Sequence, residues 1–145
     1  NINVPLPPGS GTGAYEAVIE RVVLPALQRF RPQCLFIACG YDAGVLDPLA
    51  RMMLHSEGFR AMTQRLREAA EALCDGRLVI TQEGGYCEAT GPFHALAVFE
   101  ALSGHRTGVR DPYLDLVLPM GGQALQPHQA ARIAEVEALV QRVPA

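Results

Sequence analysis

Two short segments of this sequence carry residues whose chemistry goes beyond packing, and each follows an apolar run. The first is centred on Asp42, which lies between Gly40 and Ala43 and comes after the run at 34–39. Small neighbours let a metal ion or a substrate approach the backbone closely. A carboxylate in this place can bind a metal, act as a base or cap the next helix. Taken alone, the segment favours a cap or turn, because Asp is common in turns after strands.

The second segment is Glu83-Gly84-Gly85-Tyr86, which follows the apolar run at 77–82. The two glycines allow a sharp turn and leave open space beside the Tyr86 ring. A phenol with its ordinary pKa of about 10 is a hydrogen-bond donor at neutral pH. Such a donor can stabilise the oxyanion of a tetrahedral intermediate. A glycine turn with a packed tyrosine explains the same residues, so both interpretations stay open.

Other segments give weaker signals. Residues 9–14 fit the G-x-G-x-x-[GA] dinucleotide-binding pattern, but two prolines separate them from any preceding strand. Residues 31–33 stand where the pattern requires an acidic ribose ligand. A structural loop is therefore the favoured interpretation. Asp47 and the proline after it indicate a turn or a helix start, with Asp47 tying down the loop. No Gly-x-Ser-x-Gly segment supports a serine hydrolase.

The histidines do not organise into a site. They are widely spaced, with no H-x-x-x-H or D-x-H pairing: His55, His94, His105 and His128. His94 has the pattern of a buried core residue at the start of a helix. His105 and His128 have the pattern of solvated loop or cap residues.

The apolar pattern predicts the elements that position Asp42 and Tyr86. Continuous apolar runs indicate strands at 34–39 and 77–82, each buried on both faces. The chain opens in an extended segment, 1–6, that resembles a strand. Apolar residues at helical spacing predict helices at 14–30, 59–73, 93–103 and from 127 onward.

Proline and glycine mark the ends of these helices. Pro25 is expected to kink or split the first helix near Leu24. Gly76 and Gly104 are expected to end the second and third helices.

Strands that alternate with helices predict an α/β fold with a mostly parallel sheet. Ligands bind such sheets beyond the carboxyl ends of the strands. Asp42 and Tyr86 each follow a strand at that end. We therefore expect their side chains to lie at the same end of the sheet and to converge on one pocket.

Composition narrows the class of protein. The net charge is -3 and every basic residue is Arg, without the clustered basic surface of a nucleic-acid binder. No apolar run approaches the ~18 residues of a membrane span, and no signal peptide is recognisable. No C-x-x-C pair occurs among Cys34, Cys39, Cys74 and Cys87. A reducing, cytoplasmic location is the favoured interpretation.

Taken together, these segments resemble the histone deacetylase superfamily, especially its class II-like members, the bacterial histone deacetylase-like amidohydrolases and the acetylpolyamine amidohydrolases. The similar blocks follow family order over nearly the whole chain. They are N-V-P-L-P-P-G at 3–9 with G-A-Y at 13–15, G-Y-D-A at 40–43 with D-P-L at 47–49, E-G-G-Y at 83–86, and the stretch 92–104.

The resemblance implies a partial three-layer α/β/α fold of the arginase/deacetylase kind with a mostly parallel sheet. Residues 1–145 would be the carboxy-terminal portion of a single deacetylase domain whose upstream half is absent from this chain. The implied activity is zinc-dependent hydrolysis of N-acetyl amides, with acetylated lysine or acetylpolyamine as the substrate. A homo-oligomer stays open, and neither a nucleic-acid nor a membrane partner is expected.

The resemblance also implies roles for individual residues. Asp42 would be a zinc ligand, and Tyr86 would be the catalytic tyrosine that donates a hydrogen bond to the acetyl carbonyl. Leu49, Gly84 and Gly85 would line the substrate tunnel. Zinc in such a site would polarise the amide carbonyl and lower the pKa of its water to about 7.

The sequence departs from the family in its ligands. It lacks the tandem His-His pair and the Asp-x-His pair, which belong to the half expected upstream. A catalytic zinc site needs about three protein ligands, so we expect residues 1–145 alone to be inactive and to bind zinc weakly. Two alternatives stay open: a catalytically inactive deacetylase-fold domain for binding or assembly, and a nucleotide-binding α/β module that uses the glycine loop.

Overall fold

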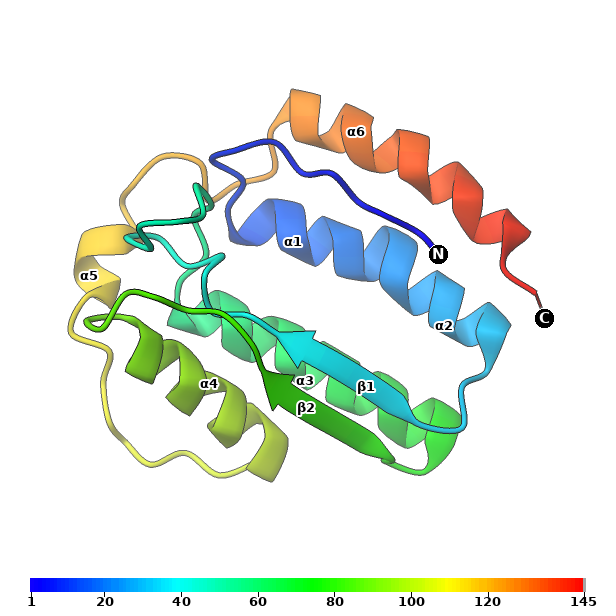
Figure 1. The fold of residues 1–145 in the computed structure, drawn as a ribbon, viewed down its shortest axis with the longest axis horizontal. Helices are drawn as coiled ribbons and strands as arrows, with labels where there is room; N and C mark the ends of the chain where they lie inside the picture. Colours follow the sequence, from blue (N-terminus) through cyan, green and yellow to red (C-terminus); the bar gives the residue numbers. More distant parts are fainter. Residues whose placement is uncertain (145) are drawn as a thin grey trace.

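The computed structural model describes residues 1–144 and has the expected α/β architecture. Two strands, β1 (Leu35–Cys39) and β2 (Leu78–Gln82), pair in parallel, in the register that sets Leu35 opposite Leu78 and Cys39 opposite Gln82. The helix α3 (Ser56–Cys74) connects them (Figure 1). The strands predicted from the apolar runs are confirmed to within one residue.

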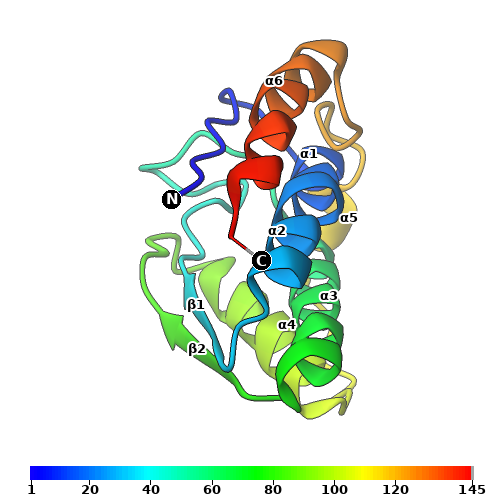
Figure 2. The same cartoon turned by 90° about the vertical axis from the view of Figure 1, so that its right-hand side faces the viewer.

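The strands are not buried on both faces, and that part of the prediction is wrong. Burial alternates along both strands, and Phe36 and Val79 are 71% and 43% exposed. Figure 2 shows the reason: the helices of the described chain gather on one side of the sheet. An apolar run alone does not reveal which face has a covering layer.

The helix α3 forms where the apolar spacing predicts it and begins three residues earlier. His55 is its N-cap, since the ring Nδ1 accepts a hydrogen bond from the Gly58 N–H at 3.2 Å. The helix ends at Asp75 and Gly76, and both of these residues have a positive φ in the left-handed region. Phe59 on its buried face meets the Tyr41 ring edge-on at 5.7 Å. This packing fixes α3 against the loop that follows β1.

A second helix, α4 (Gly91–Ser103), packs against α3 and ends at Gly104 as expected. A buried ion pair joins the two helices, with Arg60 Nη1 2.6 Å from Glu100 Oε2. Hydrogen bonds from Thr107, together with Arg60, hold the pKa of Glu100 at about 2. The carboxylate is therefore ionised at neutral pH, and the ion pair holds the carboxyl-terminal half of α4 to the first turns of α3.

The first helical region is continuous but irregular. It consists of α1 (Thr12–Val18), the π-helical turn η1 (Ile19–Val23) and α2 (Leu24–Phe30). Pro25 lies just after the π-helical turn. Proline lacks the N–H that a regular helix uses, and its ring crowds the preceding turn, so the helix widens there. The expected effect of Pro25 therefore takes the form of a wider turn within one helical region.

The opening segment is not a strand, contrary to expectation. Residues 1–6 pair with no strand in the described part of the chain. Instead, Ile2, Val4 and Leu6 pack against a core formed with the carboxy-terminal helices. An extended backbone interrupted by proline can bury alternate side chains in this way without ladder hydrogen bonds.

The remaining helices follow the expected loop. They are α5 (Leu114–Val117), α6 (Pro127–Glu137) and the 3-10 turn η2 (Ala138–Arg142). Within residues 1–144, none of the helices combines the length and apolar character required to cross a membrane.

His94, expected to be a buried core residue, is 2% exposed. Its ring packs on Phe59 with centroids 4.8 Å apart, and it fills the space beside Gly44. Burial lowers the pKa of His94 to about 4, and the charge of Asp111 offsets this only in part. The imidazole is therefore neutral in the folded protein at neutral pH.

Acidification is expected to destabilise the protein through His94. Because its folded pKa lies below the unfolded value, the unfolded state binds more protons between about pH 6.5 and pH 4. The stability that comes from neutral, buried His94 is fully present above that pH window and decreases as the pH falls through it. We expect about 2 kcal/mol of unfolding free energy to be lost through His94 between pH 7 and pH 5.

Urea denaturation at the two pH values measures this effect. His94→Gln should reduce the difference between them, whereas the same change at the exposed His105 should leave it intact. An equal loss of stability in His94→Gln and in the parent would exclude His94 as the source.

Candidate functional site

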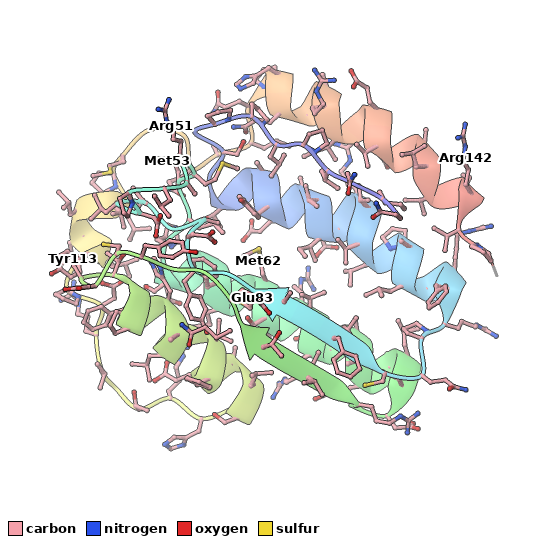
Figure 3. The ribbon with its side chains drawn as sticks, viewed as in Figure 1. Arg51, Met53, Met62, Glu83, Tyr113 and Arg142 are labelled. Atoms are coloured by element: carbon pink, nitrogen blue, oxygen red, sulfur yellow. The ribbon has the colours of Figure 1, made fainter. Side chains whose placement is uncertain are left out.

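The loops after β1 and β2 are hydrogen-bonded to each other, which extends the strand pairing beyond the sheet. The Glu83 N–H donates to the Cys39 carbonyl at 3.0 Å, and the Tyr41 N–H donates to the Gly84 carbonyl at 2.8 Å. Glu83 lies at the carboxyl end of β2 in Figure 3. Both chemically interesting segments therefore lie at one end of the sheet.

Asp42 is half-buried, and its carboxylate lies between two glycines. A Cβ atom added to Gly40 would lie 2.5 Å from Asp42 Oδ1, and one added to Gly84 would lie 2.8 Å from Oδ2. Any side chain at either position would displace the carboxylate. The glycines of the two loops thus keep space around both carboxylate oxygens.

Tyr86 is a second neighbour of Gly84. The same added Cβ at Gly84 would lie 3.3 Å from Tyr86 Cε2, so the aromatic ring and the Asp42 carboxylate are near neighbours. Tyr86 is 56% exposed and lines a hollow of about 480 Å³ beside the start of α4. Asp42 is not among the residues that line this hollow. The structure thus brings the two groups together, but this hollow does not include both of them.

Gly85 has a backbone conformation and surroundings that only glycine fits. Its φ of +130° lies in a region that side chains rarely adopt, and an added Cβ would approach Tyr41 Cβ to 2.8 Å. The predicted substrate-binding residues Gly84 and Gly85 therefore both lie between Asp42, Tyr41 and Tyr86. Leu49, the third of them, lies on the surface of the loop after β1 and is 68% exposed.

The structure adds Asp47, which the sequence indicated only as a turn residue. Its Oδ1 accepts the N–H groups of Leu49 at 2.9 Å and Ala50 at 3.3 Å. Its Oδ2 accepts the Tyr86 N–H at 2.8 Å. We call this set of hydrogen bonds the Asp47 bridge. The Asp-Pro pair signals the local turn, but no local pattern signals the bond to Tyr86.

Tyr15 on α1 is a second neighbour of Asp42 that the residue pattern alone did not assign to the site. Burial, and then the negative charge of Asp42, raise the pKa of Tyr15 to about 12. The same two causes raise the pKa of the Cys39 thiol. Both groups therefore stay protonated at neutral pH.

The Asp42 carboxylate fits a divalent cation as one ligand. Carboxylate oxygen is a normal zinc ligand, and the glycine-lined space leaves both oxygens unobstructed. Among residues 1–144, no group of three or more His, Cys, Asp or Glu side chains is arranged to hold a metal ion. The described residues therefore offer one ligand and not a complete metal site.

The glycine loop at 9–14 packs against another part of the chain. A Cβ at Gly13 would lie 2.6 Å from the Leu125 amide nitrogen, and one at Gly11 would lie 2.9 Å from Gln123 Cα. The Gly13 N–H donates to the Gln123 carbonyl at 2.7 Å. The glycines thus admit a neighbouring backbone, which supports the structural interpretation of this loop over a phosphate-binding one.

Comparisons with known proteins show the family of this chain. Residues 1–102 match the family model described as the histone deacetylase domain. The chain is 52% identical over its whole length to a histone deacetylase-like amidohydrolase of Pseudomonas aeruginosa, covering 38% of that protein. It is 37% identical, over 77% of its length, to a probable deacetylase of Archaeoglobus fulgidus, covering 32% of that protein.

A solved structure shows the same fold. The crystal structure of the HDA15 HD domain matches 97% of this chain with a TM-score of 0.76 and 28% identity, over 35% of its own length. The chain thus spans a little over a third of the length of the Pseudomonas aeruginosa relative and of the HDA15 domain.

Proposed function

The chain belongs to the histone deacetylase family, and from this premise we propose that its full-length protein is a zinc-dependent deacetylase of N-acetyl amides. The substrate class is acetyl-lysine or acetylpolyamine. One observation carries the proposal: Asp42 and Tyr86 follow two paired parallel strands, and both side chains lie next to Gly84. A ligand carboxylate and a phenol donor are thus adjacent at the end of the sheet where α/β proteins bind ligands.

In this proposal each residue has a distinct task. Asp42 is one of the zinc ligands, and bound zinc supplies Lewis-acid polarisation of the amide carbonyl and a water of lowered pKa. Tyr86 donates its hydroxyl hydrogen bond to the carbonyl oxygen as negative charge develops there. Gly84 and Gly85 keep the space between these groups free of side chains, and Leu49 is an apolar residue that lines the tunnel for the acetylated side chain.

The full-length protein tests the proposal directly. Purified protein should retain zinc after dialysis and hydrolyse an acetyl-lysine peptide or an N-acetylated polyamine. Chelation should remove this activity and added zinc should restore it. We expect the isolated chain 1–145 to retain little zinc, because Asp42 is the one family ligand that it contains. A full-length protein without zinc and without activity would instead indicate a catalytically inactive deacetylase-fold domain.

The proposal includes a reducing compartment such as the cytoplasm. All four cysteine side chains are free thiols in the structure. Free thiols are the usual state of cysteine where glutathione and thioredoxin keep proteins reduced.

A further inference from the structure

The Asp47 bridge connects two loops that are distant in the sequence. Asp47 and Tyr86 are 39 positions apart, yet the Asp47 carboxylate accepts the Tyr86 N–H at 2.8 Å. Its other oxygen accepts the N–H groups of Leu49 and Ala50, which belong to its own loop. Asp47 is 9% exposed, so these N–H groups take the place of water around the carboxylate. The Asp47 side chain thus joins the backbone of the loop after β1, which also contains Asp42, to the backbone of Tyr86.

The loop is held in an unusual conformation just before this residue. Leu46 has a φ of +73°, in the left-handed region that a leucine rarely occupies. Such a conformation is unfavourable by itself and persists only where surrounding contacts enforce it. The Asp47 N–H donates to the Gly44 carbonyl at 3.2 Å, which fixes the turn further. The loop is therefore constrained on both sides of the Asp47 backbone.

Tyr86 depends on such a constraint because its side chain is only partly packed. More than half of its surface is exposed, so packing alone does not fix the ring. Glycines precede it at 84 and 85, and glycine backbones are the least restricted. A hydrogen bond from the Tyr86 N–H to a carboxylate fixes the backbone from which the ring projects. Hydrogen bonds to charged acceptors are also stronger than those to neutral ones.

We propose that Asp47 is a positioning residue that holds the Tyr86 hydroxyl in its catalytic place through the Tyr86 backbone, an inference that rests on the proposed deacetylase function. Asp47 itself touches no reacting atom. Displacing a catalytic group by about 1 Å can lower a rate by two orders of magnitude. The hydroxyl lies at the far end of the ring, so a small rotation of the backbone moves it by a larger distance.

The charge state of Asp47 agrees with this role. Burial alone would raise the pKa of Asp47, but the N–H groups of Tyr86, Leu49, Ala50 and Cys87 together hold it below its ordinary value. The carboxylate is therefore ionised at neutral pH and only accepts hydrogen bonds. In asparagine, an NH2 group would replace one of the two carboxylate oxygens. This NH2 group would face backbone N–H donors and could not accept their hydrogen bonds.

Asp47→Asn in the full-length protein is the decisive variant, because it keeps the shape of the side chain and removes one acceptor. We expect kcat on an acetyl-lysine peptide to fall about tenfold to a hundredfold, with zinc content unchanged. In a Tyr86→Phe background the same substitution should change kcat by less than about threefold, because the hydroxyl that it positions is absent. Equal effects in both backgrounds would overturn the proposal.

Asp111→Asn is the matched control. Asp111 also bridges loop and helix with a buried carboxylate, which accepts the Ser56 hydroxyl at 2.6 Å and the Tyr113 N–H at 2.9 Å. Both substitutions should lower the melting temperature. Only Asp47→Asn should lower kcat, and a comparable kcat loss in Asp111→Asn would reduce Asp47 to a stabilising residue.

Hydrogen exchange separates this inference from the proposed function. Amide exchange at Tyr86 should become about tenfold faster in Asp47→Asn, since the bond that protects it is lost. An inactive parent protein with this faster exchange would contradict the deacetylase function and support the bridge. An active parent with unchanged exchange would support the function and overturn the bridge.

Discussion

In the full-length protein, Asp42→Ala is expected to abolish deacetylase activity through loss of the metal. A catalytic zinc site has about three protein ligands, so removing one eliminates much of the binding free energy. Elemental analysis after dialysis, together with kcat on an acetyl-lysine peptide, measures both losses in the same sample.

Asp115→Ala is a suitable control for this experiment. Asp115 is an exposed carboxylate that pairs with Arg110 on the surface, and such pairs add little stability. It should retain zinc and full activity. If Asp42→Ala kept stoichiometric zinc and a normal rate, Asp42 would be a turn residue, and the metal would have to lie elsewhere.

Tyr86→Phe is expected to lower kcat by about two to three orders of magnitude while zinc stays bound. The substitution deletes only the hydroxyl that donates to the developing oxyanion. The ring remains, so the hollow beside α4 keeps its lining and KM should change little. An interaction made only in the transition state lowers kcat and kcat/KM equally when it is removed.

Tyr113→Phe removes the same atom from a ring outside the site. Tyr113 lies next to α5 and packs on Phe93, with ring centroids 6.2 Å apart (Figure 3). This control should keep the parent rate. A full rate in Tyr86→Phe would leave Tyr86 as a packed tyrosine after a glycine turn, and the family resemblance would then describe the fold without this chemistry.

Local spacing was sufficient to predict the elements that carry the site. The apolar runs locate β1 and β2, and the stripe that includes Phe59 locates α3. Local spacing does not reveal what lies across from an element. The exposure of Phe36 and Val79, and the packing of residues 1–6 without a strand partner, both depend on which layers are present.

The site was predictable in its topology and less so in its contacts. Parallel strands place the residues that follow them at one end, so the proximity of Asp42 and Tyr86 follows from strand order. Their chemical roles came from the family resemblance, because an Asp after a strand and a Tyr after glycines have ordinary structural explanations. The hydrogen bond between Asp47 and Tyr86 could not be predicted. An Asp before proline usually accepts hydrogen bonds from its own loop, as Asp47 does from Leu49, and this explains the residue without a distant partner.

The pairing of β1 with β2 also has a consequence for the order of folding. Helices such as α3 form from contacts within a few residues, on the microsecond scale or faster. The parallel pair forms only after the chain has closed the loop 40–77, which contains the whole of α3. Closing such a loop carries an entropic cost that must be met before its contacts stabilise the chain. An intermediate with formed helices and unpaired strands therefore has Asp42 and Tyr86 on separate segments, and no site exists until the sheet is complete.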